Sequence, residues 1–255
     1  MWLFTLLLIR GVVALQAGAG LPDWILAAVP LAFIYVPVGL CAWRRVDSYS
    51  YHLAIPAFSD LPTWRSVSAL VGRVLALVVP PFLLGYTVYQ ALLFDHHAGD
   101  GFRHGLARAL AGIGEPPPAL LVRGIEALFE GRGQAIVALA VLQVLTLVAY
   151  QVFFVAIPEE FFYRGYFQTR LNEVFPRRFL ILGVPMGWGS VLAGLYFAFG
   201  HSLVQVQWWH FATFFPGLVF AWLREKSGGV VAGALCHAAF NVLVVLLDTA
   251  WGIPR

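Results

Sequence analysis

Residues 229–247 have the sequence GVVAGALCHAAFNVLVVLL, which contains no Lys, Arg, Asp or Glu. A helix needs about 20 mainly apolar residues to cross a bilayer, so this stretch is long enough to do so. Six other stretches are also apolar enough, although the sixth in chain order is short. The seven predicted spans are residues 2–19, 24–43, 67–94, 135–157, 180–206, 209–223 and 229–248. The sequence therefore predicts an all-α, polytopic transmembrane bundle of seven or eight helices.

The composition of the chain indicates the same class of protein. Of the 255 residues, 60% are apolar and 11% are charged, and the mean hydropathy is +0.80. Soluble domains carry about 25% charged residues, so a water-soluble enzyme is excluded. The 9 Trp, 9 Tyr and 21 Phe exclude a disordered chain. A net charge of +3 is too small to indicate a nucleic-acid partner, and we expect membrane lipid around the protein.

Hydropathy divides the chain into three parts. Residues 1–134 hold three spans and a polar connection, residues 135–248 hold four spans, and residues 249–255 form a short tail. In the connection, residues 119–134 (ALLVRGIEALFEGRGQ) have amphipathic spacing, which predicts a helix on the membrane surface. Arg and Lys are more frequent in the connections on one side, which favours an N-terminus inside and a C-terminus outside. We expect a multi-pass protein of the cell membrane, in the inner membrane of a bacterium.

Ionisable residues in apolar stretches are functional candidates, because each costs about 2.5–3.5 kcal/mol at a helix centre. The first cluster is Pro158-Glu159-Glu160-Phe161-Phe162-Tyr163-Arg164-Gly165. Glu160 and Arg164 are four residues apart, so they share a helix face and can form an ion pair. Glu159 faces elsewhere and stays free beside aromatic residues, as a general base would. The alternative is a solvated pair of acids at a helix end.

Two further clusters lie on later spans. His201 ends the cluster Phe197-Ala198-Phe199-Gly200-His201, which follows an apolar run from residue 191, and His237 and Asn241 are four residues apart on one helix face. Donors such as His237 and Asn241 can stabilise an oxyanion, at about 3–4 kcal/mol for one donor. The alternative is hydrogen bonding between helices, at about 1 kcal/mol each. Because all three clusters lie in the C-terminal half, we expect one polar pocket inside the bundle.

The order and spacing of these residues resemble a known family. Glu159-Glu160-x-x-x-Arg164, Phe197-x-x-x-His201 and His237-x-x-x-Asn241 are similar to the three signatures of the CAAX-protease and bacteriocin-processing (CPBP, or Abi) family of glutamic intramembrane proteases. The resemblance covers residues 135–248. It implies an endopeptidase that needs no metal ion and no cofactor.

The resemblance also implies a role for each matching residue. Glu159 would activate water and His201 would help to position it, while His237 and Asn241 would stabilise the oxyanion. Glu160 and Arg164 would form a supporting pair. The substrate would be a peptide or protein with a hydrophobic or C-terminal sorting segment, since residues 210–229 (HFATFFPGLVFAWLREKSGG) look most like the myxosortase type.

Three other classes of function stay open at this point. A proton-coupled transporter would use buried Glu, His and Arg as a relay, but it would often show two similar halves, which are not visible here. A catalytically silent scaffold or immunity protein would keep the bundle without water chemistry. A zinc peptidase would use His and carboxylate ligands, although the chain has no His-Glu-x-x-His motif.

A shared site requires the clusters to lie at one depth. Hydropathy alone ends the fourth span at residue 157, which would place Glu159 near one membrane face and far from His201. We therefore expect the helix to continue through Pro158 to about residue 172, with a kink at this proline. The next span would then cover residues 187–206.

Overall fold

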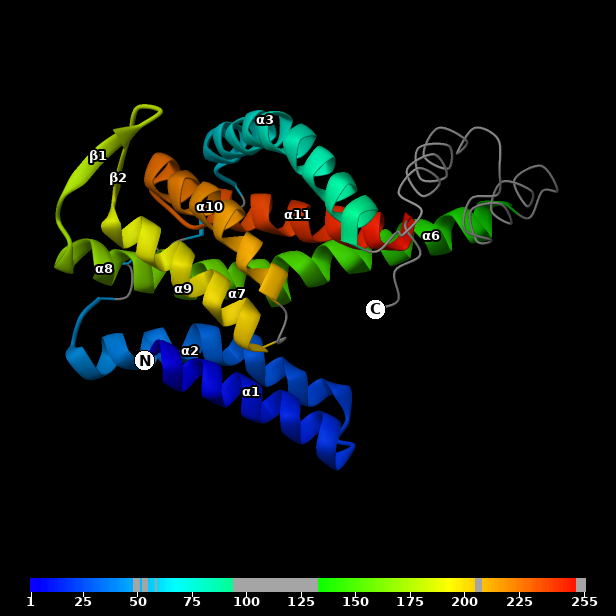
Figure 1. Ribbon diagram of the computed structural model, residues 1–255, viewed down its shortest axis with the longest axis horizontal. Helices are drawn as coiled ribbons and strands as arrows, with labels where there is room; N and C mark the ends of the chain where they lie inside the picture. Colours follow the sequence, from blue (N-terminus) through cyan, green and yellow to red (C-terminus); the bar gives the residue numbers. More distant parts are fainter. Residues whose placement is uncertain (48–50, 52–54, 58, 94–132, 205–207, 251–255) are drawn as a thin grey trace. The chain divides into compact units, whose positions relative to one another are not determined.

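The computed structural model describes residues 1–47, 51, 55–57, 59–93, 133–204 and 208–250. Residues 119–132 of the predicted surface helix and residues 251–255 of the tail lie outside this part of the chain. The elements, in chain order, are α1 (Trp2–Ala19), η1 (Asp23–Ala27), α2 (Ala28–Arg44), α3 (Leu61–Leu93), α6 (Gly133–Tyr150), η3 (Gln151–Ala156), α7 (Ile157–Glu160), η4 (Phe161–Phe167), α8 (Gln168–Val174), β1 (Arg178–Ile181), β2 (Val184–Gly187), α9 (Trp188–Val204), η5 (Trp208–Thr213), α10 (Phe214–Ser227) and α11 (Val231–Ala250). Figure 1 shows how strongly helices dominate the described chain, which confirms the all-α class.

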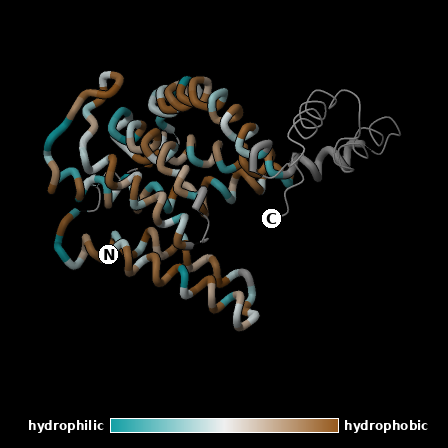
Figure 2. The backbone as a smooth tube through the Cα atoms, in the orientation of Figure 1, coloured by the Kyte–Doolittle hydropathy of each residue, from teal (hydrophilic) through white to brown (hydrophobic). Residues whose placement is uncertain are grey.

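Five helices of the described chain are long and apolar enough to cross a membrane. They cover Trp2–Ala19, Trp24–Arg44, Leu61–Gln90, Leu142–Val174 and Val231–Asp248. The predicted fifth and sixth spans correspond to α9 and α10, which are helical but have only 17 and 14 residues. The chain is thus a multi-pass membrane protein. Figure 2 shows hydrophobic residues along the whole length of α1 and α2, and many of them, such as Phe4 and Leu7, are exposed as lipid-facing residues would be.

Contacts between residues divide the chain into two compact units. The first unit contains residues 1–71 and 151–238, and the second contains residues 72–150 and 239–255. In the second unit, the Tyr86 hydroxyl donates a hydrogen bond to Asp248, and the rings of Phe82 and Phe240 pack edge to face at 5.2 Å between centroids.

The helix that carries the glutamates continues through Pro158, as predicted. It runs without a break from Gly133 to Val174 through α6, η3, α7, η4 and α8. Proline has no N–H and crowds the carbonyl four residues before it, which disturbs a regular α-helix. The π-helical segments η3 and η4 lie on the two sides of α7, the short α-helix that contains Pro158. Such π-helical turns are frequent at functional sites.

Residues 178–187 form a β-hairpin, so the prediction that the fifth span begins at residue 180 is wrong. β1 and β2 are antiparallel, with Arg178 opposite Gly187 and Ile181 opposite Val184. Leu182 and Gly183 make the turn with positive φ angles of 49° and 75°. Helix α9 begins at Trp188. This agrees with the later start, at residue 187, that was expected if the site residues lie at one depth.

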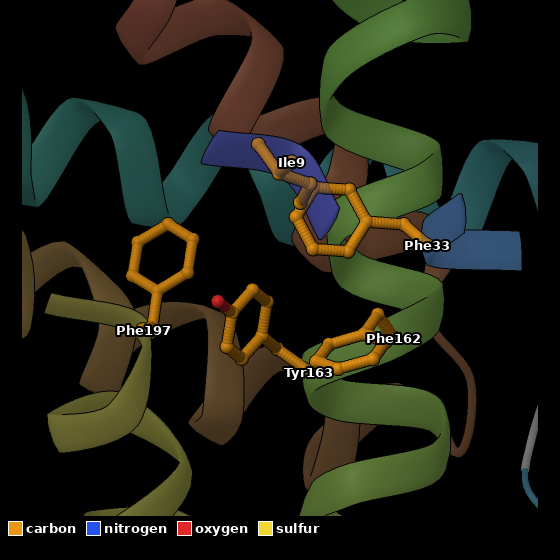
Figure 3. Close-up of a cluster of buried hydrophobic side chains, with 5 residues drawn as sticks. All are labelled: Ile9, Phe33, Phe162, Tyr163 and Phe197. Atoms are coloured by element: carbon orange, nitrogen blue, oxygen red, sulfur yellow. The ribbon is translucent and has the colours of Figure 1, made fainter. Parts of the chain in front are cut away.

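Aromatic side chains form a core in the first unit. Figure 3 shows Tyr163 between Phe197 and Phe162, with Phe33 and Ile9 packed beside them. Tyr163 and Phe162 come from η4, Phe197 comes from α9, and Phe33 and Ile9 come from α2 and α1. This core fixes the first two helices and α9 against the segment that follows the two glutamates.

Candidate active site

The Glu159 carboxylate lies between two imidazoles from two other helices of the first unit. Its Oε2 atom is 4.0 Å from Nε2 of His201, on α9, and 3.9 Å from Nε2 of His237, on α11. The Glu159 side chain is 16% exposed and that of His201 is 33% exposed. Separations of about 4 Å between polar atoms are too long for direct hydrogen bonds but fit bridging by water.

Glu160 is held by two charged or polar partners. Its Oε1 atom accepts hydrogen bonds from Nη1 of Arg164 at 3.0 Å and from Nδ1 of His237 at 3.1 Å. Neither the Glu160 nor the Arg164 side chain is exposed to any extent. The ion pair expected from the four-residue spacing is present, and Glu159 is the glutamate that this arginine does not bind.

Aromatic rings and a backbone carbonyl hold the guanidinium of Arg164. Its Nη2 atom donates to the carbonyl oxygen of Gly217 at 3.1 Å. Its central carbon lies 4.3 Å from the ring centroid of Phe197 and 5.3 Å from that of Phe220, within the range of cation–π attraction. The positive charge is therefore stabilised by several groups at once, although it is fully removed from solvent.

The ring of His237 is fixed by packing and by its bond to Glu160. It stacks on Phe220 with 4.9 Å between centroids and meets Phe197 edge-on at 5.6 Å. Because a carboxylate only accepts hydrogen bonds, Nδ1 of His237 must carry the proton in the bond to Glu160. Its Nε2 atom is then directed at Glu159, as an acceptor in the neutral ring and as a donor in the imidazolium.

His201 is oriented by its own helix. Its Nδ1 atom lies 3.1 Å from the carbonyl oxygen of Phe197, four residues earlier. A carbonyl can only accept, so Nδ1 donates and Nε2 faces Glu159. The two imidazoles thus present the same type of nitrogen atom to one carboxylate oxygen.

Asn241 lies four residues after His237 on α11 and belongs to the second compact unit. The helix places it on nearly the same face as His237. Its role in binding an oxyanion stays a prediction. In the part of the chain that the structure describes, no group of three or more His, Cys, Asp or Glu side chains is arranged to hold a metal ion.

Sequence reasoning missed two residues that complete the surroundings of the ion pair. Gly217 supplies the carbonyl that binds Arg164, and a Cβ atom at this position would lie 3.2 Å from Nη2 of Arg164. Phe220 stacks on His237 and also covers Arg164. The only sequence signal was a small residue followed three positions later by an aromatic one on an apolar stretch, and this pattern is common in membrane helices.

A second polar network, which sequence reasoning also missed, lies on α8 and α10. Glu225 Oε1 accepts from Gln168 Nε2 at 2.9 Å, from Asn172 Nδ2 at 2.8 Å and from Arg224 Nη1 at 2.7 Å. A cavity of about 290 Å³ beside this network is lined by Thr169, Asn172, Glu173, Arg178, Arg224 and Glu225. These contacts join the end of the glutamate helix to α10.

The fold and the site together define a multi-pass membrane protein in which the imidazoles of His201 and His237 face one carboxylate oxygen of Glu159. Residues 140–243, which include all six candidate site residues, match the family described as type II CAAX prenyl endopeptidase Rce1-like. No curated protein and no solved structure shows a significant match to the chain. The family match confirms the resemblance seen in the three motifs and indicates a CAAX-protease-like endopeptidase of the membrane. The myxosortase type stays a prediction.

Proposed function

We propose that this protein hydrolyses a peptide bond of a membrane-associated substrate with a water molecule that Glu159 activates, without a metal ion. The observation that carries the proposal is the position of Glu159 Oε2, about equally far from Nε2 of His201 and Nε2 of His237. A water molecule bound there can reach all three groups. This Oε2 atom is buried and has no protein hydrogen-bond partner among the described residues.

The chemistry assigns a different task to each carboxylate. Glu159 takes a proton from the water, whose oxygen then attacks the carbonyl carbon of the peptide, and the same proton is available to the leaving amine. Glu160 is assigned no part in activating the water, because it is fully removed from solvent and its charge is paired with Arg164. His201, with its Nδ1 bound to the backbone, offers Nε2 to hold the attacking water.

The tetrahedral intermediate carries a negative oxygen that needs donors. His237 donates from Nε2 only as an imidazolium, because its Nδ1 proton is committed to Glu160. The amide of Asn241 is the second proposed donor. Donors aimed at a developing oxyanion in a site shielded from water act more strongly than they would in solution.

The substrate that we propose is a peptide or protein with a hydrophobic or C-terminal sorting segment, since residues 210–229 look most like the myxosortase type and a multi-pass membrane protein meets chains that partition into the membrane. The location that we propose is a bacterial inner membrane. A proton-coupled transporter or a silent scaffold would keep the same buried charges but would not need a base between two imidazoles.

The decisive experiment compares Glu159→Gln with the wild-type protein, purified and tested on a panel of peptides with C-terminal sorting segments and on CAAX peptides. Because a positioned general base contributes about 10²–10⁴-fold, we expect kcat to fall by that factor. The matched control is Glu173→Gln, since Glu173 is on the same helical run but is about half exposed, and it should retain full activity. Equal cleavage by Glu159→Gln would refute the proposed role.

A chelator separates this mechanism from a zinc peptidase. We expect cleavage to continue at an unchanged rate after exhaustive treatment with EDTA or phenanthroline. Loss of cleavage, with recovery on addition of zinc, would assign the reaction to a metal.

A further inference from the structure

The β1–β2 hairpin exposes large apolar side chains outside the candidate spans. Leu180 is 77% exposed and Leu182 is 80% exposed, and Phe179 and Ile181 are also exposed. The preceding candidate span ends at Val174, so these residues are not part of a membrane helix. Figure 2 shows the change from hydrophilic residues near the start of β1 to hydrophobic ones at the tip. In contact with water this surface would be unfavourable.

The turn of the hairpin carries a leucine in a conformation that does not favour it. Leu182 has φ = 49° and precedes Gly183, which has φ = 75°. Two-residue turns with both central φ angles positive favour Asn-Gly or Asp-Gly, since Asn and Asp tolerate the left-handed region better than leucine. Because Leu182 is also highly exposed, packing within this chain does not offset the strain. An apolar side chain kept at such a position points to a contact outside the chain.

The rest of the hairpin is held firmly against α10. Val184 and Met186 of β2 are buried and pack with Ala221, beside Trp222. The indole Nε1 of Trp222 donates to the carbonyl oxygen of Ile181 at 3.0 Å. The exposed tip is therefore presented by an ordered base and keeps a fixed position on the first unit.

Basic residues surround the base of the hairpin. Arg177 directly precedes β1 and Arg178 begins it, and both residues are exposed. Arg178 Nη1 donates to Asn172 Oδ1 at 3.0 Å, which ties the start of β1 to α8. Figure 1 shows the hairpin running crosswise to α8 instead of continuing along its axis. Because the candidate span Leu142–Val174 ends with α8, the end of α8 marks the membrane surface in our proposal, and the hairpin runs along that surface.

We infer that the β1–β2 hairpin is a membrane-interface anchor that binds anionic phospholipid. The apolar tip, Phe179 to Leu182, enters the outer part of the acyl-chain region, and the arginines at its base contact the phosphate groups of the same leaflet. Exposed apolar residues beside arginines match both parts of such a lipid. The alternative is that the edge of β1 that does not pair with β2 binds a peptide by strand addition. A bound peptide would not require an exposed leucine at the turn.

The experiment uses the full-length protein in nanodiscs, with a bimane label on Leu182→Cys. The native Cys41 and Cys236 are buried, so labelling is selective. We expect spin-labelled lipids with the nitroxide near the headgroup end of the acyl chain to quench the bimane strongly, and aqueous iodide to quench it weakly. The control label, on the exposed Ser227→Cys, should be quenched mainly by iodide.

The lipid preference is tested in the same labelled protein with brominated phosphatidylglycerol and brominated phosphatidylcholine. We expect phosphatidylglycerol to associate more strongly, and Arg177→Gln to lower this preference by about fivefold, since each basic residue near an anionic surface contributes about that factor. Strong iodide quenching at residue 182, or equal association of the two lipids, would overturn the proposal. A bimane signal that responds only to added substrate peptide would assign the hairpin to peptide binding and would also overturn it.

Discussion

Glu160 and Arg164 form a fully buried ion pair in the middle of a candidate membrane span. Two such charges lose their hydration, and only close mutual contact and further hydrogen bonds offset that loss. Here Gly217, Phe197 and His237 supply those further contacts. The pair therefore serves to hold the imidazole of His237 in one orientation, and its contribution to stability depends on all partners being present.

Removing one partner of this pair should destabilise the protein strongly. We expect Arg164→Met to lower the free energy of unfolding by about 3–5 kcal/mol, because it leaves a buried carboxylate without its counter-charge. The control is Arg170→Met, on the same helical run, whose ion pair with Glu173 is 37% and 49% exposed. That change should cost less than about 1 kcal/mol. Thermal unfolding in detergent micelles measures both, and equal effects would contradict the role of burial.

The Glu160–Arg164 pair follows from the sequence because four residues bring two side chains onto one helix face. The convergence of His201 and His237 on Glu159 does not follow from any spacing, since it depends on how three helices pack. It could be anticipated only because ionisable residues are costly in apolar stretches, so several of them on neighbouring spans indicate a shared functional site. The carbonyl of Gly217 was not predictable, since every residue has a carbonyl group.

At the scale of elements, α8 and α9 approach each other closely at Gly189. A Cβ atom at this position would lie 2.3 Å from Oδ1 and 2.6 Å from the backbone nitrogen of Asn172. The backbone cannot yield as a flexible side chain can, so any larger residue forces the two helices apart. Helix α9 also carries His201, so a change in the packing of α9 against α8 would move the His201 imidazole.

We expect Gly189→Ala to lower the melting temperature by several degrees and to reduce peptide cleavage at the same time. The matched control is Gly11→Ala in α1, where a Cβ atom would meet nothing within 4 Å. Alanine is a better helix former than glycine by about 1 kcal/mol, so this control should leave the protein as stable or more stable. Unchanged unfolding and cleavage in Gly189→Ala would show that the helices can separate without consequence.

The hairpin shows where hydropathy fails as a predictor of elements. Residues 180–186 are as apolar as a membrane helix, and a scale that counts transfer free energy cannot distinguish a strand from the start of a span. The signals that do distinguish them are Gly183 at the turn and Pro185 within β2. The continuation of the helix through Pro158 was predictable for a different reason. Glu159 and His201 can share a site only if they lie at the same depth, and this requires the helix to continue although proline tends to end helices.

The strain at the hairpin turn gives a further test at this scale. We expect Leu182→Asn to stabilise the detergent-solubilised protein by about 1 kcal/mol, because asparagine adopts the positive φ of 49° more readily than leucine. Leu180→Asn changes the same side-chain type on β1, outside the turn, and should give no such gain. A lower melting temperature for Leu182→Asn would show that the leucine contributes to packing within the chain.

At the scale of the whole molecule, the distribution of basic residues predicts one orientation in the membrane, with the N-terminus inside. It also predicts that the segment after α1 is outside, whereas the hairpin and the end of α10 are inside. Single cysteines at Ala19 and Ser227, both exposed, report on these two sides, and the buried native cysteines give little background. We expect a membrane-impermeant maleimide to label Ala19→Cys in intact cells and to label Ser227→Cys only after permeabilisation. The reverse pattern would contradict the predicted orientation and would place the arginines of the hairpin on the outer side of the membrane.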